Sequence, residues 1–360
     1  MINPFLITGD DGSRYADSCC SLNRMIIAEV PVKGIDDSIK GKRVMDIFSL
    51  SVISEKALSF ADRLRLPKDV SPKEIPSLLM SAAESEDMTV RAAAENIAEF
   101  FGKRLALILL TLKTALPENR KIRRDWNSSH WEYWQSIENI VAVGGLTDGN
   151  FGKVLIDEAR KYCVLNGRQA YNIITHKNAV YMGVMGCSKI LRNSEGVNVL
   201  ADFGQTNIKI SIVKRLDGKI VKTENLPKVK SEYMQLDIED KAELERQAKL
   251  LHEYILSCIC NACKKAEVFG NAGNEIVISI ASYVNSGKLD KNRGGYAKLN
   301  VLCDNYEEYL SRSISDVLNK NIKVKLVHDA TAVGLYFSDC PKSVCLTLGT
   351  FIGVGFTDII

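Results

Sequence analysis

The chain has 360 residues, of which 46% are hydrophobic and 25% are charged, and its formal net charge is +3. This composition is typical of a soluble globular protein and excludes a disordered chain, while the length suits two domains of ordinary size. Lys and Arg are dispersed apart from one local cluster at residues 120–124, so we expect a solvated loop there and no nucleic-acid partner.

The 10 cysteines are scattered, the chain does not start with a signal peptide, and no apolar run approaches the ~18 residues of a membrane helix. We therefore expect a cytoplasmic protein without a membrane segment. Cys258, Cys260 and Cys263 come closest to a metal pattern. They lie in residues 250–266, which read as an amphipathic helix on which Cys258 points away from Cys260. We predict small core or boundary residues there.

The first third of the chain predicts few elements. Residues 1–60 mix short apolar runs with turns and are the least readable part. Residues 89–116 carry apolar side chains at helical spacing, which predicts one long helix or two shorter ones packed in the core. The segment 126–134 holds all three Trp residues and is interpreted as a surface flap or a partner contact.

A glycine pair follows the next predicted strand. Residues 137–143 form an apolar run that leads into Gly144 and Gly145, and the amphipathic helix 151–162 comes next. A glycine pair before a helix is common in any α/β protein, although it can also receive a nucleotide at the helix N-terminus. Residues 178–191 then predict a helix rich in small side chains.

The most informative stretch is residues 197–212, in which an apolar run delivers Asp202 into a tight turn before a second apolar run. Gly204 would let the backbone approach phosphate oxygens, and the amides around Gln205 and Thr206, with the Thr206 hydroxyl, could donate hydrogen bonds to them. Asp202 would face a magnesium ion, directly or through water. The alternative is ordinary hairpin chemistry around an Asp turn.

A second carboxylate stands at a predicted strand exit. Residues 322–327 read as a buried strand that ends at His328 and Asp329, where a run of small residues opens a helix. Asp329 could serve as a catalytic group at this position. It could equally be a helix N-cap, a position that Asp fills well without any catalytic role.

A second glycine-rich hairpin is predicted near the end of the chain. The apolar strand 344–348 runs into Gly349 and Thr350, and Gly353 follows within the next apolar run. The alternative is a plain hairpin with glycines at its turn and at a bulge. We expect residues 356–360 to end the chain as a strand.

Together these segments resemble the sugar kinases of the actin-like ATPase superfamily, most closely the ROK family, which includes many bacterial glucokinases. Residues 202–206 look like its first phosphate motif, 328–332 resemble the segment with the catalytic Asp, 348–355 are similar to the second phosphate motif, and Gly144 with Gly145 would form the adenosine motif. The resemblance implies an α/β, two-lobed actin/hexokinase-like (RNase H-like) fold with a cleft between the lobes.

The order of the motifs differs from that of the family. Family members begin with the first phosphate motif and end with the adenosine motif, whereas here the adenosine motif comes first, so the chain looks circularly permuted. The polar turn 192–196 would join the old ends. One lobe would then comprise residues 1–174 and 336–360, and the other residues 175–335. The alternative is that residues 1–190 are an unrelated domain.

The resemblance implies an enzyme that uses ATP and Mg²⁺ to phosphorylate a hydroxyl group of a hexose or an amino sugar. Asp329 would be the general base, and Asp202, Gly204, Gln205, Thr206, Lys209, Gly349, Thr350, Gly353, Gly144 and Gly145 would bind the nucleotide, with Asp202 at the metal. His328, in place of the family's Asn, would contact the sugar together with Asp329. Gly294, Gly295 and Tyr296 lie where relatives place a sugar-contacting loop, and could equally be a solvated turn.

Several departures from the family pattern are visible. Phe351 and Val354 stand where the family usually has glycine, which could narrow the phosphate cradle. The family's zinc site would map near Cys19 and Cys20, where its spacing is absent, so we predict no zinc. A sensor that binds nucleotide or sugar without catalysis is the alternative function, and a filament-forming or chaperone-type ATPase is a third. Residues 1–50 lack the helical pair of a DNA-binding repressor, and a homodimer is left open.

Overall fold

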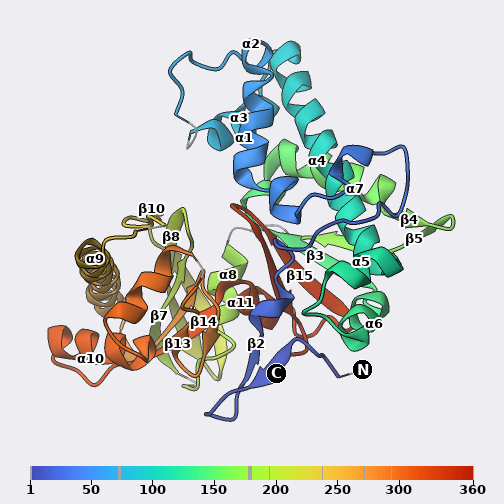
Figure 1. The fold of residues 1–360 in the computed structure, drawn as a ribbon. Coiled ribbons are helices and arrows are strands. Elements are labelled where there is room, and N and C mark those ends of the chain that lie inside the picture. The colour runs from blue at the N-terminus through green and yellow to red at the C-terminus, as the bar shows by residue number, and fades with distance from the viewer. Residues whose placement is uncertain are drawn as a thin grey trace. The chain divides into compact units, whose positions relative to one another are not determined.

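The computed structural model describes residues 2–71, 74–176, 181–193, 195–236, 238–270, 272–292 and 294–359. The chain is mixed α/β and divides into two compact units, each built around one main sheet (Figure 1). Unit 1 comprises Met1–Phe5, Cys19–Val180 and Cys340–Val354, and unit 2 comprises Leu6–Ser18, Tyr181–Asp339 and Gly355–Ile360. No helix in the described part of the chain has the length and apolar character needed to cross a membrane.

Unit 2 contains a six-stranded sheet in the order β10-β8-β7-β11-β14, with β9 paired to β8. Its strands are β7 (Gly196–Phe203), β8 (Asn207–Leu216), β9 (Lys219–Asn225), β10 (Val229–Lys230), β11 (Ala272–Ile280) and β14 (Lys323–His328). The pairs β7–β8 and β8–β9 are antiparallel, whereas β11 runs parallel to β7 and β14 runs parallel to β11. The predicted hairpin over 197–212 and the predicted strand over 322–327 are confirmed.

Helices cover both faces of this sheet. They are α8 (Met182–Cys187), α9 (Lys241–Ala266), α10 (Tyr306–Leu318) and α11 (Asp329–Tyr336), with the 3-10 helices η6 (Glu267–Phe269) and η7 (Gly295–Val301). The alternate β7 residues Val197, Val199, Ala201 and Phe203 pack with α9 and α10. Leu200 faces the other way, toward α8 and α11. Since side chains alternate along a strand, Asp202 also lies on the α8 and α11 face.

The helix expected over 178–191 is shorter in the structure, because α8 ends at Cys187; its first three positions lie outside the described residues. A Cβ atom added to Gly186 of α8 would lie 1.6 Å from the carbonyl oxygen of Ala332 in α11. The two helices therefore cross at backbone contact. The cysteine prediction is confirmed, because Cys260 belongs to the core while Cys258 and Cys263 pack against it half-buried.

The sheet of unit 1 has four strands in the order β16-β15-β3-β6. They are β3 (Asn139–Val143), β6 (Asn172–Thr175), β15 (Ser343–Leu348) and β16 (Ile352–Phe356), and the last residues of β16 belong to unit 2. β3 runs parallel to both β15 and β6. The strand expected over 356–360 is wrong, because β16 ends at Phe356 and the polar residues Thr357 and Asp358 form a turn.

Seven α-helices of unit 1 fall within the described residues: α1 (Leu50–Leu58), α2 (Ala61–Leu64), α3 (Ile75–Ala83), α4 (Met88–Thr114), α5 (Pro117–Ile122), α6 (Ser128–Ser136) and α7 (Gly149–Tyr162). The pattern over 89–116 is therefore one helix. Asp87 caps it by accepting from the backbone N–H groups of Thr89 and Val90 at 2.9 and 3.3 Å.

The Trp segment is core and not surface, so its interpretation as a flap or partner contact is wrong. Trp126, Trp131 and Trp134 are at most 5% exposed. Phe5 packs edge-on against Trp126 and Trp134, with ring centroids 5.1 and 6.4 Å apart. Burying these large apolar rings stabilises the region and ties the N-terminal residues to α6.

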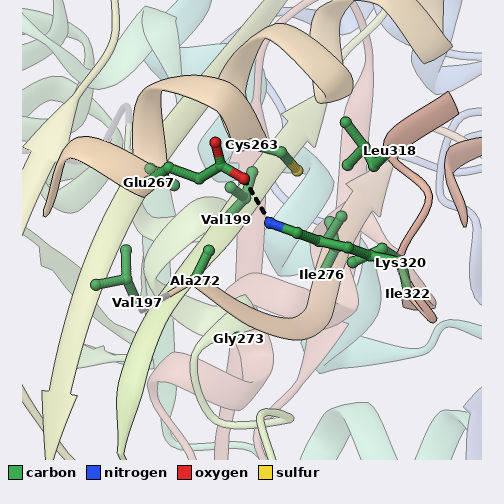
Figure 2. Close-up of a pocket in the computed structure, with 11 residues that line it drawn as sticks. Val197, Val199, Cys263, Glu267, Ala272, Gly273, Ile276, Leu318, Lys320 and Ile322 are labelled. Carbon is green, nitrogen blue, oxygen red and sulfur yellow. Dashed lines mark hydrogen bonds and ion pairs between the residues drawn. The ribbon is translucent and has the colours of Figure 1, made fainter. Parts of the chain in front are cut away.

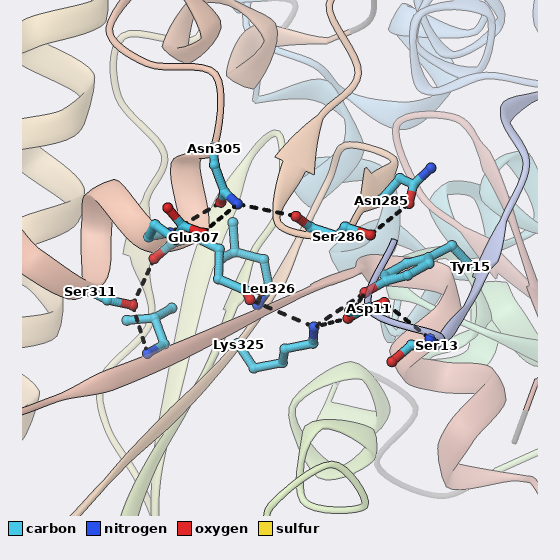
Figure 3. Close-up of polar contacts among 12 residues, drawn as sticks. Asp11, Ser13, Tyr15, Asn285, Ser286, Asn305, Glu307, Ser311, Lys325 and Leu326 are labelled. Carbon is cyan, nitrogen blue, oxygen red and sulfur yellow. Dashed lines mark hydrogen bonds and ion pairs between the residues drawn. The ribbon is translucent and has the colours of Figure 1, made fainter. Parts of the chain in front are cut away.

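Short paired strands complete the description: β1 (Leu6–Thr8) with β2 (Arg14–Ala16), β4 (Val164–Leu165) with β5 (Arg168–Gln169), and β12 (Val284–Asn285) with β13 (Lys288–Leu289). Figure 3 shows how the β1–β2 hairpin is held in unit 2. The ammonium of Lys325 lies 3.2 Å from both Asp11 Oδ2 and the Tyr15 hydroxyl, and 3.6 Å from Glu307 Oε1. One half-buried lysine of β14 thus joins the hairpin to α10.

Candidate functional site

The carboxyl ends of the parallel strands in unit 2 bring polar side chains to one edge of the sheet. In the strand register, Asp202 of β7 is opposite Ser279 of β11, and Ile280 of β11 is opposite His328 of β14. Asp329 follows directly as the first residue of α11. In open α/β sheets, ligands bind at this edge. Two carboxylates far apart in sequence therefore meet where a ligand would be expected.

Asp202 is a fixed and neutralised carboxylate. It is 7% exposed, its Oδ2 lies 2.7 Å from Lys209 Nζ, and its Oδ1 accepts a 2.9 Å hydrogen bond from Ser279 Oγ. Lys209 is its cross-strand neighbour in the β7–β8 hairpin. On the helix side, a Cβ atom on Gly183 would lie 3.5 Å from the carboxylate, so α8 closes over it. The predicted pair Asp202 and Lys209 therefore acts as one unit.

Asp329 has the properties of a proton acceptor. Its Oδ1 accepts a 2.7 Å hydrogen bond from the Ala330 N–H and lies 3.1 Å from His328 Nε2. Among the described residues, Oδ2 has no partner. Burial and then the negative charge of Asp202 raise the pKa of Asp329 to about 7. The side chain is nevertheless 32% exposed, so a substrate could reach it.

Asp329 is not the N-cap of α11, so that alternative is wrong. The N-cap position belongs to His328, whose side chain makes no capping hydrogen bond. Instead the imidazole stacks on Tyr283, with ring centroids 4.3 Å apart and an interplanar angle of 15°, and its Nδ1 lies 3.1 Å from Thr331 Oγ1. Tyr283 and Thr331 were missed by the sequence analysis. Only the spacing of Thr331, three residues into a helix, could have suggested its contact.

The predicted phosphate loop and the predicted sugar loop are joined to each other. The Gln205 side chain donates from Nε2 to the Ala281 carbonyl at 3.0 Å and accepts from the Gly295 N–H at 3.3 Å. The Tyr296 hydroxyl donates to the Gly204 carbonyl at 2.9 Å. Gln205 is thus a structural bridge whose side chain is already engaged, while Thr206 is exposed at the turn.

The Gly294 position suits only glycine. It has φ +73°, and a Cβ atom there would lie 2.7 Å from Gln205 Nε2. The backbone of this loop therefore approaches the Asp202 hairpin as closely as it can. Arg293, which precedes it, lies outside the described residues.

In unit 1, the glycine pair lies against the second glycine-rich hairpin. Gly144 has φ +107°, and a Cβ atom there would lie 2.5 Å from the carbonyl oxygen of Leu348 at the end of β15. A Cβ atom on Gly145 or Gly349 would meet nothing within 4 Å. The predicted adenosine and second phosphate motifs therefore come together within this unit, and two of their glycines border open space.

The rest of the second hairpin is anchored by hydrogen bonds. Asn23 accepts from the Ile352 N–H at 3.1 Å and donates to its carbonyl at 2.9 Å, and the Thr350 carbonyl accepts from the Leu50 N–H at 3.1 Å. Gly353 lies in β16, half-buried. Val354 is fully buried, whereas Phe351 is 41% exposed at the tip. Val354 thus belongs to the core and does not intrude on the turn.

The N-terminus of α7, where the glycine pair could have delivered a nucleotide, already holds carboxylates. Glu84 Oε1 accepts from the Asn150 N–H at 2.6 Å, and Asp148 accepts from the Gly149 N–H at 3.1 Å. Negative side chains favour this end of a helix, for the same reason that phosphates do. Glu84 would repel a phosphate there, so this helix end is a poor phosphate site in the present arrangement.

Figure 2 shows a cavity at the opposite end of the unit 2 sheet, where β7 and β11 begin. It encloses about 20 Å³ between Val197, Cys263 and Ile276, and the ion pair of Lys320 with Glu267 lies across it. That volume suits a single water molecule. Burial raises the pKa of the Cys263 thiol to about 12, which keeps it unreactive. This cavity is a packing defect and not a ligand site.

Asp202 was expected to contact a magnesium ion, directly or through water. Each oxygen of that carboxylate already engages one partner, Lys209 or Ser279. Mg²⁺ usually keeps several waters and is held by phosphates with one or two carboxylates. The geometry fits a hydrated ion whose waters Asp202 would contact, and not direct coordination. Within the described ranges, no group of three or more His, Cys, Asp or Glu side chains could hold a metal ion.

The structure therefore gathers the predicted residues in two places. Unit 2 brings together Asp202, Lys209, His328 and Asp329, with Gly204, Gln205 and Gly294–Tyr296 beside them. Unit 1 brings Gly144 against the strand end that precedes Gly349. Comparison of the chain with protein-family models and with curated proteins gave no match.

Proposed function

We propose that this chain is an ATP-dependent carbohydrate kinase of the actin-like fold, which phosphorylates a hydroxyl group of a hexose or an amino sugar. The observation that carries the proposal is the Asp329 carboxyl group. Its pKa is raised to about 7, its Oδ2 has no partner among the described residues, and it stands at the sheet edge beside the Asp202–Lys209 pair. A general base works best when its pKa lies near the working pH.

The topology of the two sheets supports the fold part of the proposal. In unit 2 the order is β8-β7-β11-β14, where β7 and β8 form a hairpin and the other two strands run parallel to β7. In unit 1 the order β16-β15-β3-β6 repeats this arrangement, but β3 and β6 precede the hairpin strands in the chain. Unit 1 therefore matches unit 2 once its ends are joined and reopened before β15, as a circular permutation requires.

The compartment is part of the same proposal. All 10 cysteines lie in the described part of the chain, and none of them forms a disulfide. Thiols in this number that form no disulfide are what a reducing cytoplasm permits.

The residues of unit 2 suggest how the reaction would proceed. Asp329 Oδ2 would take the proton of the attacking sugar hydroxyl, whose oxygen would form a bond to the γ-phosphorus as the bond to the ADP oxygen breaks. The Lys209 ammonium and the backbone amides around Gly204 and Thr206 would balance the phosphate charge. Magnesium bound to the phosphates would neutralise further charge, with Asp202 touching its waters. The proton on Asp329 would then leave to solvent.

The test is ATP-dependent phosphorylation across a panel of hexoses, amino sugars and other polyols with Mg²⁺, comparing the wild type with Asp329→Asn. Asparagine preserves size and can still accept from the Ala330 N–H, but it cannot accept a proton. We expect a loss of ~10² to 10⁴-fold in kcat, the usual contribution of a general base. Asp339→Asn, at a side chain 92% exposed, is the matched control. ATP binding without turnover on any acceptor would refute the kinase and favour a sensor.

A further inference from the structure

We infer that His328 is a positioning residue for the base: its Nε2 lies 3.1 Å from Asp329 Oδ1, a contact that favours the ionised carboxylate and leaves Oδ2 facing the substrate. The role of Asp329 as a base rests on the proposed function. The His–Asp contact itself does not, because it is a feature of the folded chain without ligands.

The imidazole ring of His328 is held firmly. It is 8% exposed, it stacks on the Tyr283 ring at 4.3 Å and 15°, and its Nδ1 lies 3.1 Å from Thr331 Oγ1. A buried ring with a stacking partner on its face and a hydroxyl at one nitrogen loses little freedom when its other nitrogen engages a carboxylate. The ring can therefore fix the direction of its Nε2–H bond.

The contacts also decide where the protons lie. An ionised carboxylate can only accept, so the 3.1 Å contact is favourable when His328 Nε2 carries the proton. In a neutral ring Nδ1 must then accept, and the Thr331 hydroxyl can donate to it. If the ring is charged, Nδ1 donates to the same hydroxyl. In both states Nε2 carries a proton beside Asp329, while Oδ1 accepts a hydrogen bond from the Ala330 N–H.

Several charged or titratable groups from other elements face Asp329. Burial and Asp202 on β7 raise its pKa, while Lys209 on β8 lowers it, and the Tyr296 phenol of η7 faces both carboxylates. Lys209 is paired with Asp202, so His328 Nε2, at 3.1 Å, is the side-chain nitrogen closest to Asp329, next to the backbone N–H of Ala330 at 2.7 Å. Hydrogen bonds to a charged acceptor are about twice as strong as neutral ones. Removing this donor should make the ionised form of Asp329 harder to maintain.

Three substitutions separate the ring from its donor. His328→Phe keeps a flat ring against Tyr283 and removes both nitrogens. His328→Gln places an amide N–H near the position of Nε2, whereas His328→Asn reaches only the position of Nδ1, beside Thr331. The pKa of Asp329 should therefore change by a similar amount in the Phe and Asn variants and should stay near the wild-type value in the Gln variant.

The measurement is the pKa of the Asp329 carboxyl group, followed by NMR on chain labelled with ¹³C at the Asp carboxyl carbons and assigned with Asp329→Asn. Loss of the Nε2–H contact should raise this pKa by about one to two pH units in His328→Phe and His328→Asn. His328→Gln should stay within about half a unit of the wild type. An unchanged pKa in a folded Phe or Asn variant would overturn the inference. If Phe does not fold, the Gln–Asn comparison decides alone.

Turnover then distinguishes the two proposals. If the chain is a kinase, the acid limb of kcat should move upward with the measured pKa in the Phe and Asn variants, while KM for ATP stays unchanged. A shifted pKa without kinase activity in the wild type would support the His–Asp contact and refute the function. Kinase activity in the wild type, with no shift of the pKa or of the acid limb in the Phe and Asn variants, would support the function and refute the role of His328.

Discussion

Replacing Lys209 by methionine removes the cation that neutralises Asp202 while keeping most of the apolar length of the side chain. The ammonium lies 2.7 Å from Asp202 Oδ2, and the side chains of Lys209 and Asp202 are 19% and 10% exposed. Breaking a buried ion pair by removing one partner usually costs 3–5 kcal/mol, because the other charge is left uncompensated. Ser279 retains its bond to Oδ1 and Lys209 is partly exposed, so we expect about 3 kcal/mol.

The assay is urea-induced unfolding of the full chain, with probes assigned separately to the two units because two compact units need not unfold in one step. Lys214→Met is the matched control, since Lys214 lies exposed on the same strand β8. It should change the free energy of unfolding by no more than about 0.5 kcal/mol. The double variant Asp202→Asn with Lys209→Met completes a cycle that isolates the coupling.

The double variant should recover most of the stability that Lys209→Met loses, because no buried charge remains. Two results would refute the reasoning. In the first, Lys209→Met costs no more than Lys214→Met. In the second, the double variant loses the sum of the two single losses, which would mean that Asp202 and Lys209 are not energetically coupled.

Two further predictions concern the glycine pair and the N-terminal hairpin. Gly144→Ala should lower the free energy of unfolding, measured by thermal unfolding, by about 3 kcal/mol or more, because φ is +107° and a Cβ atom would lie 2.5 Å from the carbonyl oxygen at the end of β15. The control Gly145→Ala should change it by no more than about 0.5 kcal/mol. Equal losses in the two variants would contradict this prediction. Burial alone would raise the pKa of Asp11, but hydrogen bonds from Tyr15 and Lys325 lower it overall. The ionised Asp11 therefore stabilises the fold above the pKa of an unfolded Asp, ~4, and this contribution is lost as the pH falls. Asp11→Asn should therefore reduce stability at neutral pH and converge with the wild type in acid; a constant difference across pH would count against the network.

Strongly periodic segments were predictable because one buried face or one continuous apolar run decides them. The hairpin of β7 and β8 and the strands β14 and β15 lie within a few residues of their expected bounds. The helix expected over 250–266 begins earlier, at Lys241. Its first turns are polar, so the hydrophobic pattern could not reveal them, although the Asp240 side chain caps the helix by accepting from Glu243 N–H at 2.6 Å.

Segments held by distant partners could not be predicted. The β1–β2 hairpin is fixed by Lys325, more than 300 positions away in the chain. The Trp segment was interpreted as surface because its apolar partner, Phe5, lies far away in the chain, in the least readable stretch of the sequence. No local pattern carries either contact.

The candidate site shows the same division. Asp202 and Lys209 flank a short turn, so their cross-strand pairing follows from the hairpin that the sequence predicts. The contacts of Ser279 with Asp202, and of Tyr283 with His328, depend on which strands become neighbours in the sheet. Strand order is a property of the whole unit. Residue types could therefore nominate the carboxylates but not the side chains that tune them.

The two carboxylates also share a mechanical connection. The longest of the three stretches of unit 2 begins at Tyr181, directly before α8, and ends at Asp339, shortly after α11. Gly183 of α8 lies against Asp202, and Asp329 is the first residue of α11. Because these helices cross at backbone contact, through Gly186, neither can shift without displacing the other. The helices near the two ends of this longest stretch of unit 2 thus bear directly on both carboxylates of the candidate site.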